Sequence, residues 1–163
     1  MKYAASPSQG QSQGAVYEGA WRQGLPHGHG VMQDALGFYD GEWVRGQRHG
    51  KGKLVYRDGS VYEGQFEEDK RHGKGSLVAE GQYAAVYRGE WFKDVIQGRG
   101  HMEFSTGHIF DGNFFEGLPH GHGTLICPSV DGQRLTIECK WNKGVREGRT
   151  NVVHGLRLRF LPT

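Results

Sequence analysis

Aromatic residues and glycines alternate with polar residues along this chain, in short stretches that recur at a regular spacing. Each stretch opens with an aromatic residue, a glycine and a second aromatic residue at every second position. Successive side chains of a β-strand point to opposite faces, so these three positions share one face of a strand. The clear openings are Tyr17/Gly19/Trp21, Tyr39/Gly41/Trp43, Tyr62/Gly64/Phe66, Tyr87/Gly89/Trp91 and Phe110/Gly112/Phe114.

A second half with the same period of two follows each opening. It has the form Gly-x-Gly-x-apolar and occurs as Gly28/Gly30/Met32, Gly50/Gly52/Leu54, Gly73/Gly75/Leu77, Gly98/Gly100/Met102 and Gly121/Gly123/Leu125. The segment between the halves carries Gly24, Gly46 or Gly117 in three of the copies, which is typical of a hairpin with glycine in a longer loop. Each copy therefore predicts a two-stranded antiparallel hairpin.

The spacing of the two halves predicts the register of each hairpin. The pairs expected in the first copy are Tyr17 with Met32, Gly19 with Gly30, and Trp21 with Gly28. Glycine inside a strand usually weakens it and marks the close approach of another group. We therefore expect an aromatic ring to lie across the bare glycine backbone of the partner strand.

A sixth, weaker copy aligns Ile137/Cys139/Trp141 with Gly148/Thr150/Val152. Successive copies start about 22 to 27 residues apart, which is the spacing of a repeat array, and lone hairpins are too unstable to stand without neighbours. The sequence thus predicts an all-β fold, an elongated single-layer array of about six hairpins. The expected units are a disordered tail at 1–15, repeats near 16–36, 37–59, 60–84, 85–107, 108–132 and 133–152, and a C-terminal capping strand at 153–163.

Composition narrows the possible partners. The chain has 163 residues, the size of one domain, and its net charge of +2 does not call for a nucleic acid or another polyanion. Cys127 and Cys139 are its only cysteines, and with no visible signal peptide they favour free thiols in a reducing compartment. No apolar run approaches the roughly 18 residues that a membrane span requires.

These copies closely resemble the MORN (membrane occupation and recognition nexus) repeat family. Its pattern is Tyr-x-Gly-x-Trp/Phe-x-x-Gly-x-x-His-Gly-x-Gly followed by an apolar residue, and repeats one to three match it at nearly every position. Repeat five carries Phe110 in place of the tyrosine, and repeat four has Asp94-Val95-Ile96-Gln97 in place of the loop glycine and histidine. The resemblance spans roughly residues 16–152. It implies an elongated array of hairpins with a shallow groove, serving as a scaffold or adaptor.

Histidine pairs at His27-x-His29 and His120-x-His122 suggest metal ligands, but the repeat explains His27 and His120 as its recurring loop histidine, and His29 and His122 stand at a position that is Lys or Arg in the other copies. No cysteine or carboxylate completes a tetrahedral set, so we expect no metal and no cofactor. The stretch Gly28-His29-Gly30 lacks the strand-to-helix context of a phosphate-binding loop. No serine or cysteine stands in a nucleophile elbow, so we also expect no enzymatic activity.

One position is cationic in every clear copy, as His29, Lys51, Lys74, Arg99 and His122. The predicted register places Glu42 opposite Lys51 and Glu90 opposite Arg99, where cross-strand ion pairs are expected. The neighbouring column is mostly acidic: Glu18, Asp40, Glu63, Arg88 and Asp111. Mixed signs in adjacent columns favour a solvated face over a stripe for lipid headgroups or nucleic acid.

The aromatic columns are core residues first, yet a single layer cannot cover both sides of them. We expect part of this face to line an open groove for an extended or helical peptide, formed by Tyr17, Trp21, Tyr39, Trp43, Tyr62, Phe66, Tyr87, Trp91, Phe110 and Phe114. A second candidate surface is an apolar contact patch at the hairpin ends, formed by Phe92, Val95, Ile96, Phe115 and Leu118. The alternative is that these residues pack on the longer insert that precedes repeat four.

The expected function is that of a non-enzymatic scaffold that binds other proteins of a larger complex. By resemblance, a cytoskeletal setting in the cytoplasm is expected, with the ciliary or flagellar axoneme (radial spoke or central apparatus) foremost. A peripheral phospholipid-binding module at a membrane junction is the alternative. The sequence leaves the oligomeric state open.

Overall fold

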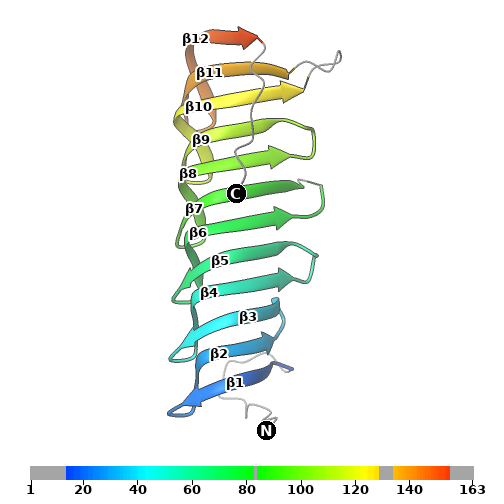
Figure 1. Cartoon of the computed structure of the whole chain (residues 1–163), viewed down its shortest axis with the longest axis vertical. Helices are drawn as coiled ribbons and strands as arrows, with labels where there is room; N and C mark the ends of the chain where they lie inside the picture. The colour runs from blue at the N-terminus through cyan, green and yellow to red at the C-terminus, as the bar shows by residue number, and fades with distance from the viewer. Residues whose placement is uncertain (1–13, 83, 129–133, 155–163) are drawn as a thin grey trace.

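The computed structural model describes residues 14–82, 84–128 and 134–154. Within these ranges the chain forms one sheet of twelve strands, each paired antiparallel with its neighbours in sequence. The strands are stacked as successive rungs along the long axis of the molecule (Figure 1). They are β1 (Val16–Arg22), β2 (Leu25–Gln33), β3 (Gly37–Val44), β4 (Gln47–Tyr56), β5 (Val61–Glu67), β6 (Lys70–Ala79), β7 (Ala85–Phe92), β8 (Val95–Phe104), β9 (Ile109–Phe115), β10 (Leu118–Pro128), β11 (Arg134–Asn142) and β12 (Val145–His154).

The predicted all-β array of hairpins is confirmed in this architecture. The array ends slightly later than expected, because Val153 and His154 still belong to β12 and pair with β11. The tail predicted at 1–15 falls almost wholly outside the described residues, and so does the remainder of the capping strand predicted at 153–163.

Tight turns join the two strands of each hairpin along one edge of the sheet, at the left in Figure 1. In the first hairpin the turn consists of Gln23 at φ 53° and Gly24 at φ 75°. Two consecutive residues with positive φ make a type I′ turn, whose twist suits the strands that it joins. The loop is therefore two residues long, shorter than the sequence suggested. The second turn position is glycine in most hairpins, but Asp69 and Asp94 occupy it in repeats three and four at φ 67° and 70°.

The centre of each hairpin has the predicted register. In the first copy the confirmed pairs are Tyr17 with Met32 and Gly19 with Gly30. The prediction that Trp21 pairs with Gly28 is wrong, because a bulge shifts the register and places Trp21 opposite Pro26. Gly28, at φ 76°, pairs instead with Trp43 of the next repeat. The bulge recurs in the other hairpins, so this glycine belongs to the junction between repeats.

The core is a row of aromatic rings that lie over the paired glycines. A Cβ atom on Gly75 would stand 2.6 Å from both Cε2 and Cζ of Tyr62, so a side chain at this position would occupy the same space as the ring. The Tyr62 hydroxyl donates a hydrogen bond to the Gln65 carbonyl at 2.9 Å, and the tyrosines of repeats one, two and four make the same bond. The bare backbone and this hydrogen bond together fix the ring.

Rings from neighbouring repeats interlock edge to face along the array. Trp43 packs on Tyr39 of its own repeat at 5.2 Å and on Tyr17 of the preceding repeat at 5.3 Å between ring centroids. The same zigzag continues to Trp141 in the last hairpin, which packs on Phe110 at 5.4 Å. Such pairs contribute about 0.5–1.5 kcal/mol beyond their burial. Each repeat therefore depends on its neighbours to complete its own core.

In repeats two and three, arginines cover the rings at a position that is proline in repeats one and five. Arg71 stacks over Trp91 at 4.3 Å, and its Nε donates to Asp94 Oδ1 at 3.0 Å. Arg48 makes the equivalent bond to Asp69 at 3.2 Å. The turns that contact these two arginines, in repeats three and four, carry aspartate in place of glycine. Each turn aspartate therefore occurs together with an arginine in the repeat before it.

Candidate partner-binding surfaces

The aromatic columns form the core of the array and do not line an open groove. Their members are 0–4% exposed, with Tyr62 fully buried, except for Trp21 at 40%. A partner cannot reach a buried ring, so the expected groove of aromatic side chains is corrected by the structure. Nine of these ten positions hold the repeats together: Tyr17, Tyr39, Trp43, Tyr62, Phe66, Tyr87, Trp91, Phe110 and Phe114. Partner binding by Trp21 stays a prediction.

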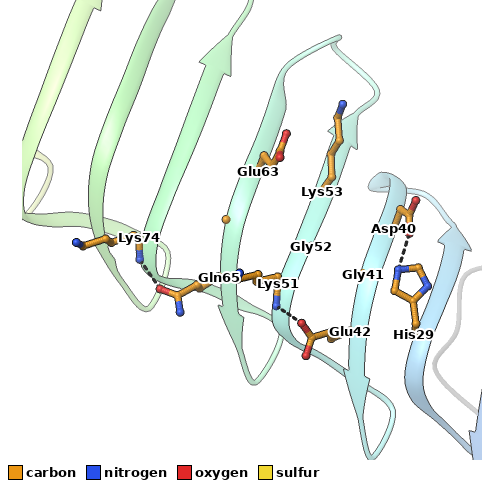
Figure 2. Close-up of a pocket in the computed structure, with 11 residues that line it drawn as sticks. His29, Asp40, Gly41, Glu42, Lys51, Gly52, Lys53, Glu63, Gln65 and Lys74 are labelled. Atoms are coloured by element: carbon orange, nitrogen blue, oxygen red, sulfur yellow. Dashed lines mark hydrogen bonds and ion pairs between the residues drawn. The ribbon is translucent and has the colours of Figure 1, made fainter. Parts of the chain in front are cut away.

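The groove lies on the opposite face of the sheet. The glycines leave the strands without side chains on the core side, and the residues that alternate with them form the walls of a shallow channel of about 730 Å³ over repeats two and three. Figure 2 shows charged side chains of this channel on one face of consecutive strands. Its lining comprises His29, Asp40, Gly41, Glu42, Lys51, Gly52, Lys53, Glu63, Gly64, Gln65 and Lys74.

Similar hollows continue the channel toward the end of the array. The next one shares Lys74 with the first, and the one beyond it shares Arg99 and Asp111. The cationic column predicted from the sequence therefore runs along one continuous groove. Its charge is mixed, because Lys51, Lys53 and Lys74 face carboxylates on the same walls. This agrees with the expectation of a solvated polar face.

The predicted ion pairs across the hairpins are replaced by hydrogen bonds to the backbone. Glu42 Oε1 accepts a hydrogen bond from the backbone N–H of Lys51 at 3.0 Å, and Glu90 Oε2 accepts one from Arg99 N–H at 3.0 Å. Gln65, which has no charge, does the same for Lys74 at 2.8 Å (Figure 2). These side chains satisfy an N–H group that the bulge releases from the strand pairing. The cationic side chains are left free to meet solvent or a partner.

A small polar network lies on the groove face where repeats four and five meet. His101 lies 3.2 Å from Asp111 and 3.1 Å from Glu103, which also pairs with Arg88 at 3.2 Å. Arg88 and His101 therefore both lie against Glu103 in this network. They are consistent with a solvated wall of the groove.

A second surface runs along the hairpin turns, where repeats four and five carry exposed apolar side chains. We call it the tip patch and define it as Phe92, Val95, Phe115 and Leu118, which are 37–47% exposed. Ile96 was expected to belong to it, but the structure places Ile96 against the buried core, opposite Trp91. Ile96 occupies the position of Arg48 and Arg71 and covers the rings as they do.

Repeats four and five each carry two exposed apolar side chains beside the turn, whereas repeats one and two carry one each, Leu25 and Val44. The positions equivalent to Phe92 and Val95 in repeat three are Glu67 and Lys70, the residues that flank the Glu68–Asp69 turn. Lysines border the patch: Lys93 Nζ lies 5.5 Å from the Phe92 ring centroid, and Lys143 Nζ lies 5.2 Å from that of Phe115. These four apolar side chains lie outside the buried core.

The described part of the chain contains no group of three or more His, Cys, Asp and Glu side chains arranged to hold a metal ion. No described helix is long and apolar enough to cross a membrane. Cys127 and Cys139 are both free, and burial raises the pKa of the Cys139 thiol.

Sequence reasoning identified the polar columns as a solvated face but assigned the groove to the aromatic face. The signal was present in the period of two: if glycines stand on the aromatic face, the intervening polar residues must wall the other. The backbone role of Glu42 and Glu90 was missed, because it depends on a bulge that the repeat spacing does not reveal.

A sequence model of the MORN repeat matches five consecutive segments, at residues 17–35, 39–61, 62–79, 87–109 and 110–129. No curated protein matches the chain. MORN repeats are non-catalytic modules that mediate binding to proteins or membrane lipids. The matched segments cover more than half of the sequence and coincide with the hairpins of the sheet, and the chain therefore belongs to the MORN repeat family.

Proposed function

We propose that this protein is a non-enzymatic scaffold that holds partner proteins within a cytoskeletal assembly. The setting that we propose is the axoneme of a cilium or flagellum, in the radial spoke or central apparatus. The protein would act by rigid display: interlocked repeats fix the spacing of the surfaces, and the surfaces bind the partners.

The tip patch is the observation that supports this proposal most strongly. Exposed apolar side chains that a core does not need mark contact surfaces when they are contiguous. Phe92 and Val95 flank one turn, and Phe115 and Leu118 flank the next, so all four lie on adjacent hairpins. The turns are themselves linked, since Gly117 N–H donates to the Ile96 carbonyl at 2.9 Å. A partner would meet a preorganised surface and little ordering would be needed on binding.

The groove offers a second contact of a different kind. Its walls carry free cations and carboxylates at repeating intervals, which suit a polar, extended segment that runs along the array. Contacts of this kind contribute more to orientation and specificity than to affinity. We therefore assign anchoring to the tip patch and alignment to the groove.

Detergent extraction of cells that carry the tagged full-length chain tests the proposal. The wild-type protein should stay in the detergent-insoluble cytoskeleton. The variant Phe92→Ser/Val95→Ser should move to the soluble fraction, because it loses both anchors at one turn. The matched control Glu67→Ser/Lys70→Ser changes the same two positions in repeat three and should behave as wild type. A wild-type protein that leaves with the detergent-soluble fraction refutes the cytoskeletal setting.

The phospholipid alternative makes a different prediction about the groove cations. A peripheral lipid-binding module would sediment with anionic vesicles at low salt, and this binding would disappear with Lys51→Ala/Lys74→Ala/Arg99→Ala. The scaffold proposal expects no such sedimentation, because carboxylates share the walls with these cations.

A further inference from the structure

The two ends of the sheet are complementary to each other. The outer edge of β1 has no neighbouring strand among the described residues, and neither has the outer edge of β12. Everywhere inside the array, the second strand of one hairpin pairs antiparallel with the first strand of the next. The free strand β12 is a second strand, and the free strand β1 is a first strand. We propose that β12 of one copy pairs with β1 of another copy, so that the protein assembles head to tail.

The β1 edge lacks the contacts that a preceding repeat would supply. Trp21 is 40% exposed, whereas Trp43 and Trp91, which hold the same position in later repeats, are each 4% exposed. Trp43 donates its indole N–H to the Gly30 carbonyl of the repeat before it at 3.0 Å, and Trp91 donates to that of Gly75 at 3.3 Å. In the described structure Trp21 packs on one tyrosine, Tyr17, instead of two. A docked repeat would cover the exposed side of this ring.

The β12 edge retains the backbone feature that every internal junction uses. Glycine at the bulge pairs with the second aromatic residue of the next repeat, as Gly28 does with Trp43. These glycines have φ between 57° and 92° at positions 28, 50, 73, 98 and 121, and Gly148 of β12 has φ 78°. Gly148 therefore has the backbone conformation that pairs with the second aromatic residue of a following repeat. No such repeat follows it within the described chain.

Transferring the internal register to the two ends predicts a specific set of pairs. The pairs expected between copies are Gly148 with Trp21, Thr150 with Gly19, Val152 with Tyr17, and Val153 with Val16. The last two have close counterparts inside the array, where Leu54 pairs with Tyr62 and Val55 with Val61. Val16 is 58% exposed in the single chain, and this pairing would cover it.

The turns would extend the same linkage. At each internal junction the second turn residue donates its N–H to a carbonyl of the preceding hairpin, as Gly46 does to Pro26 at 2.9 Å. The equivalent atoms at the new junction are the N–H of Gly24 and the carbonyl of Arg146, the partner of Trp141 in the last hairpin. Each contact joins opposite ends of two copies, so the interface is heterologous and generates a linear assembly. The rungs run along one axis in Figure 1, which keeps the two edges facing away from each other.

Disulfide trapping tests this register directly. The full-length chain with Cys127→Ser and Cys139→Ser provides a background without other thiols, and Val16→Cys/Val153→Cys is added to it. The two positions lie about 50 Å apart within one chain, since eleven strand spacings of roughly 4.8 Å separate them, so any disulfide between them joins two copies. Mild oxidation should give a ladder of dimers, trimers and longer species on a non-reducing gel.

A register control accompanies this variant. Val16→Cys/Asn151→Cys moves the second thiol two residues along β12, out of register with Val16, and should give a much weaker ladder. Equal ladders from the two variants, or no ladder from the first, overturn the proposal.

Light scattering of the unmodified chain provides the second measurement. The apparent mass should rise with protein concentration, and Trp21→Arg should hold the chain at the monomer mass because it places a charge against the docking strand. A wild-type chain that stays monomeric at every concentration overturns the proposal, including the case in which residues outside the described ranges cover one of the edges.

Discussion

The glycine at the centre of the second strand is expected to be the most sensitive small residue in a repeat. In Gly75→Ala the new Cβ would lie 2.6 Å from two atoms of the Tyr62 ring, whereas carbon atoms normally approach to about 3.5–4.0 Å. The ring would have to move by roughly 1 Å. It is held between Phe66 and Trp91 at 5.1 and 5.3 Å and is tied by its hydroxyl to Gln65. We expect a loss of about 3 kcal/mol, the upper end of the range for overpacking.

A second substitution should recover part of this loss. Tyr62→Ile alone replaces the ring with a smaller aliphatic side chain and should cost about 3 kcal/mol through the cavity that it leaves. In the double variant the alanine methyl group occupies part of that cavity, so the combined loss should be smaller than the sum by about 1–2 kcal/mol. Repeat six already uses this combination, because Ile137 stands at the tyrosine position and Cys139 and Thr150 stand at the glycine positions.

Urea unfolding measures the four corners of this cycle. Circular dichroism and tryptophan fluorescence should be followed together, since coincident transitions are needed before free energies are compared. Ser76→Ala is the matched control, because residue 76 points to the opposite face and should change stability by less than about 0.5 kcal/mol. A loss below about 0.5 kcal/mol for Gly75→Ala, or strict additivity in the double variant, would refute the account of the ring lying over the glycine.

Three further outcomes are expected. Asp69→Gly should destabilise the array by about 1–2 kcal/mol, because Arg48 loses its hydrogen-bond partner. Adding Arg48→Pro should recover part of this loss, because it recreates the Pro26–Gly46 combination of the first junction. Thermal melting compares the two variants. Burial raises the pKa of Tyr87 to about 12, so the stability contributed by its neutral form is complete below the unfolded pKa of 10 and falls as pH rises toward 12. Absorbance at alkaline pH should show tyrosine ionisation and loss of the fold together. Ionisation of Tyr87 near pH 10 in an intact fold would contradict this. Burial also raises the pKa of the Cys139 thiol, so its reaction with a disulfide reagent at mildly alkaline pH should be slower in the folded chain than in urea.

The sequence predicts the hairpins and the direction of the array well, because both depend on a strict period. Tyr17, Gly19, Gly30 and Met32 have counterparts at nearly fixed spacing in the later copies, and the structure pairs Tyr17 with Met32 and Gly19 with Gly30 as expected. The burial of the rings was harder to foresee. A single sheet has no second layer, but ring packing between neighbouring repeats and arginines such as Arg71 cover the aromatic face instead. The Arg71 side chain that covers Trp91 is held by Asp94, 23 residues further along the chain, which a pattern within one repeat does not show.

The bulge explains the remaining differences. The spacing from Trp21 to Gly28 allows a regular ladder, and nothing in the residue types announces that Gly28 takes a positive φ and leaves the hairpin register. Once it does, an N–H group is released on the groove face, and a nearby carboxylate or amide accepts its hydrogen bond. Where the residue that carries this N–H is a lysine and the acceptor is a glutamate, as with Lys51 and Glu42, the sequence suggests an ion pair although the hydrogen bond is made by the backbone.

The two interpretations of Glu42 can be separated by substitution. If its function is to accept the Lys51 N–H, then Glu42→Gln keeps the acceptor and should stay within about 0.5 kcal/mol of wild type, while Glu42→Ala should lose about 1 kcal/mol. Gln65 supports this expectation, since it accepts the equivalent hydrogen bond at 2.8 Å without a charge. Lys51→Met should be nearly neutral for stability, and added salt should not change the ranking. If an ion pair were the cause, Lys51→Met and Glu42→Gln would both be as harmful as Glu42→Ala, and the difference would shrink in high salt.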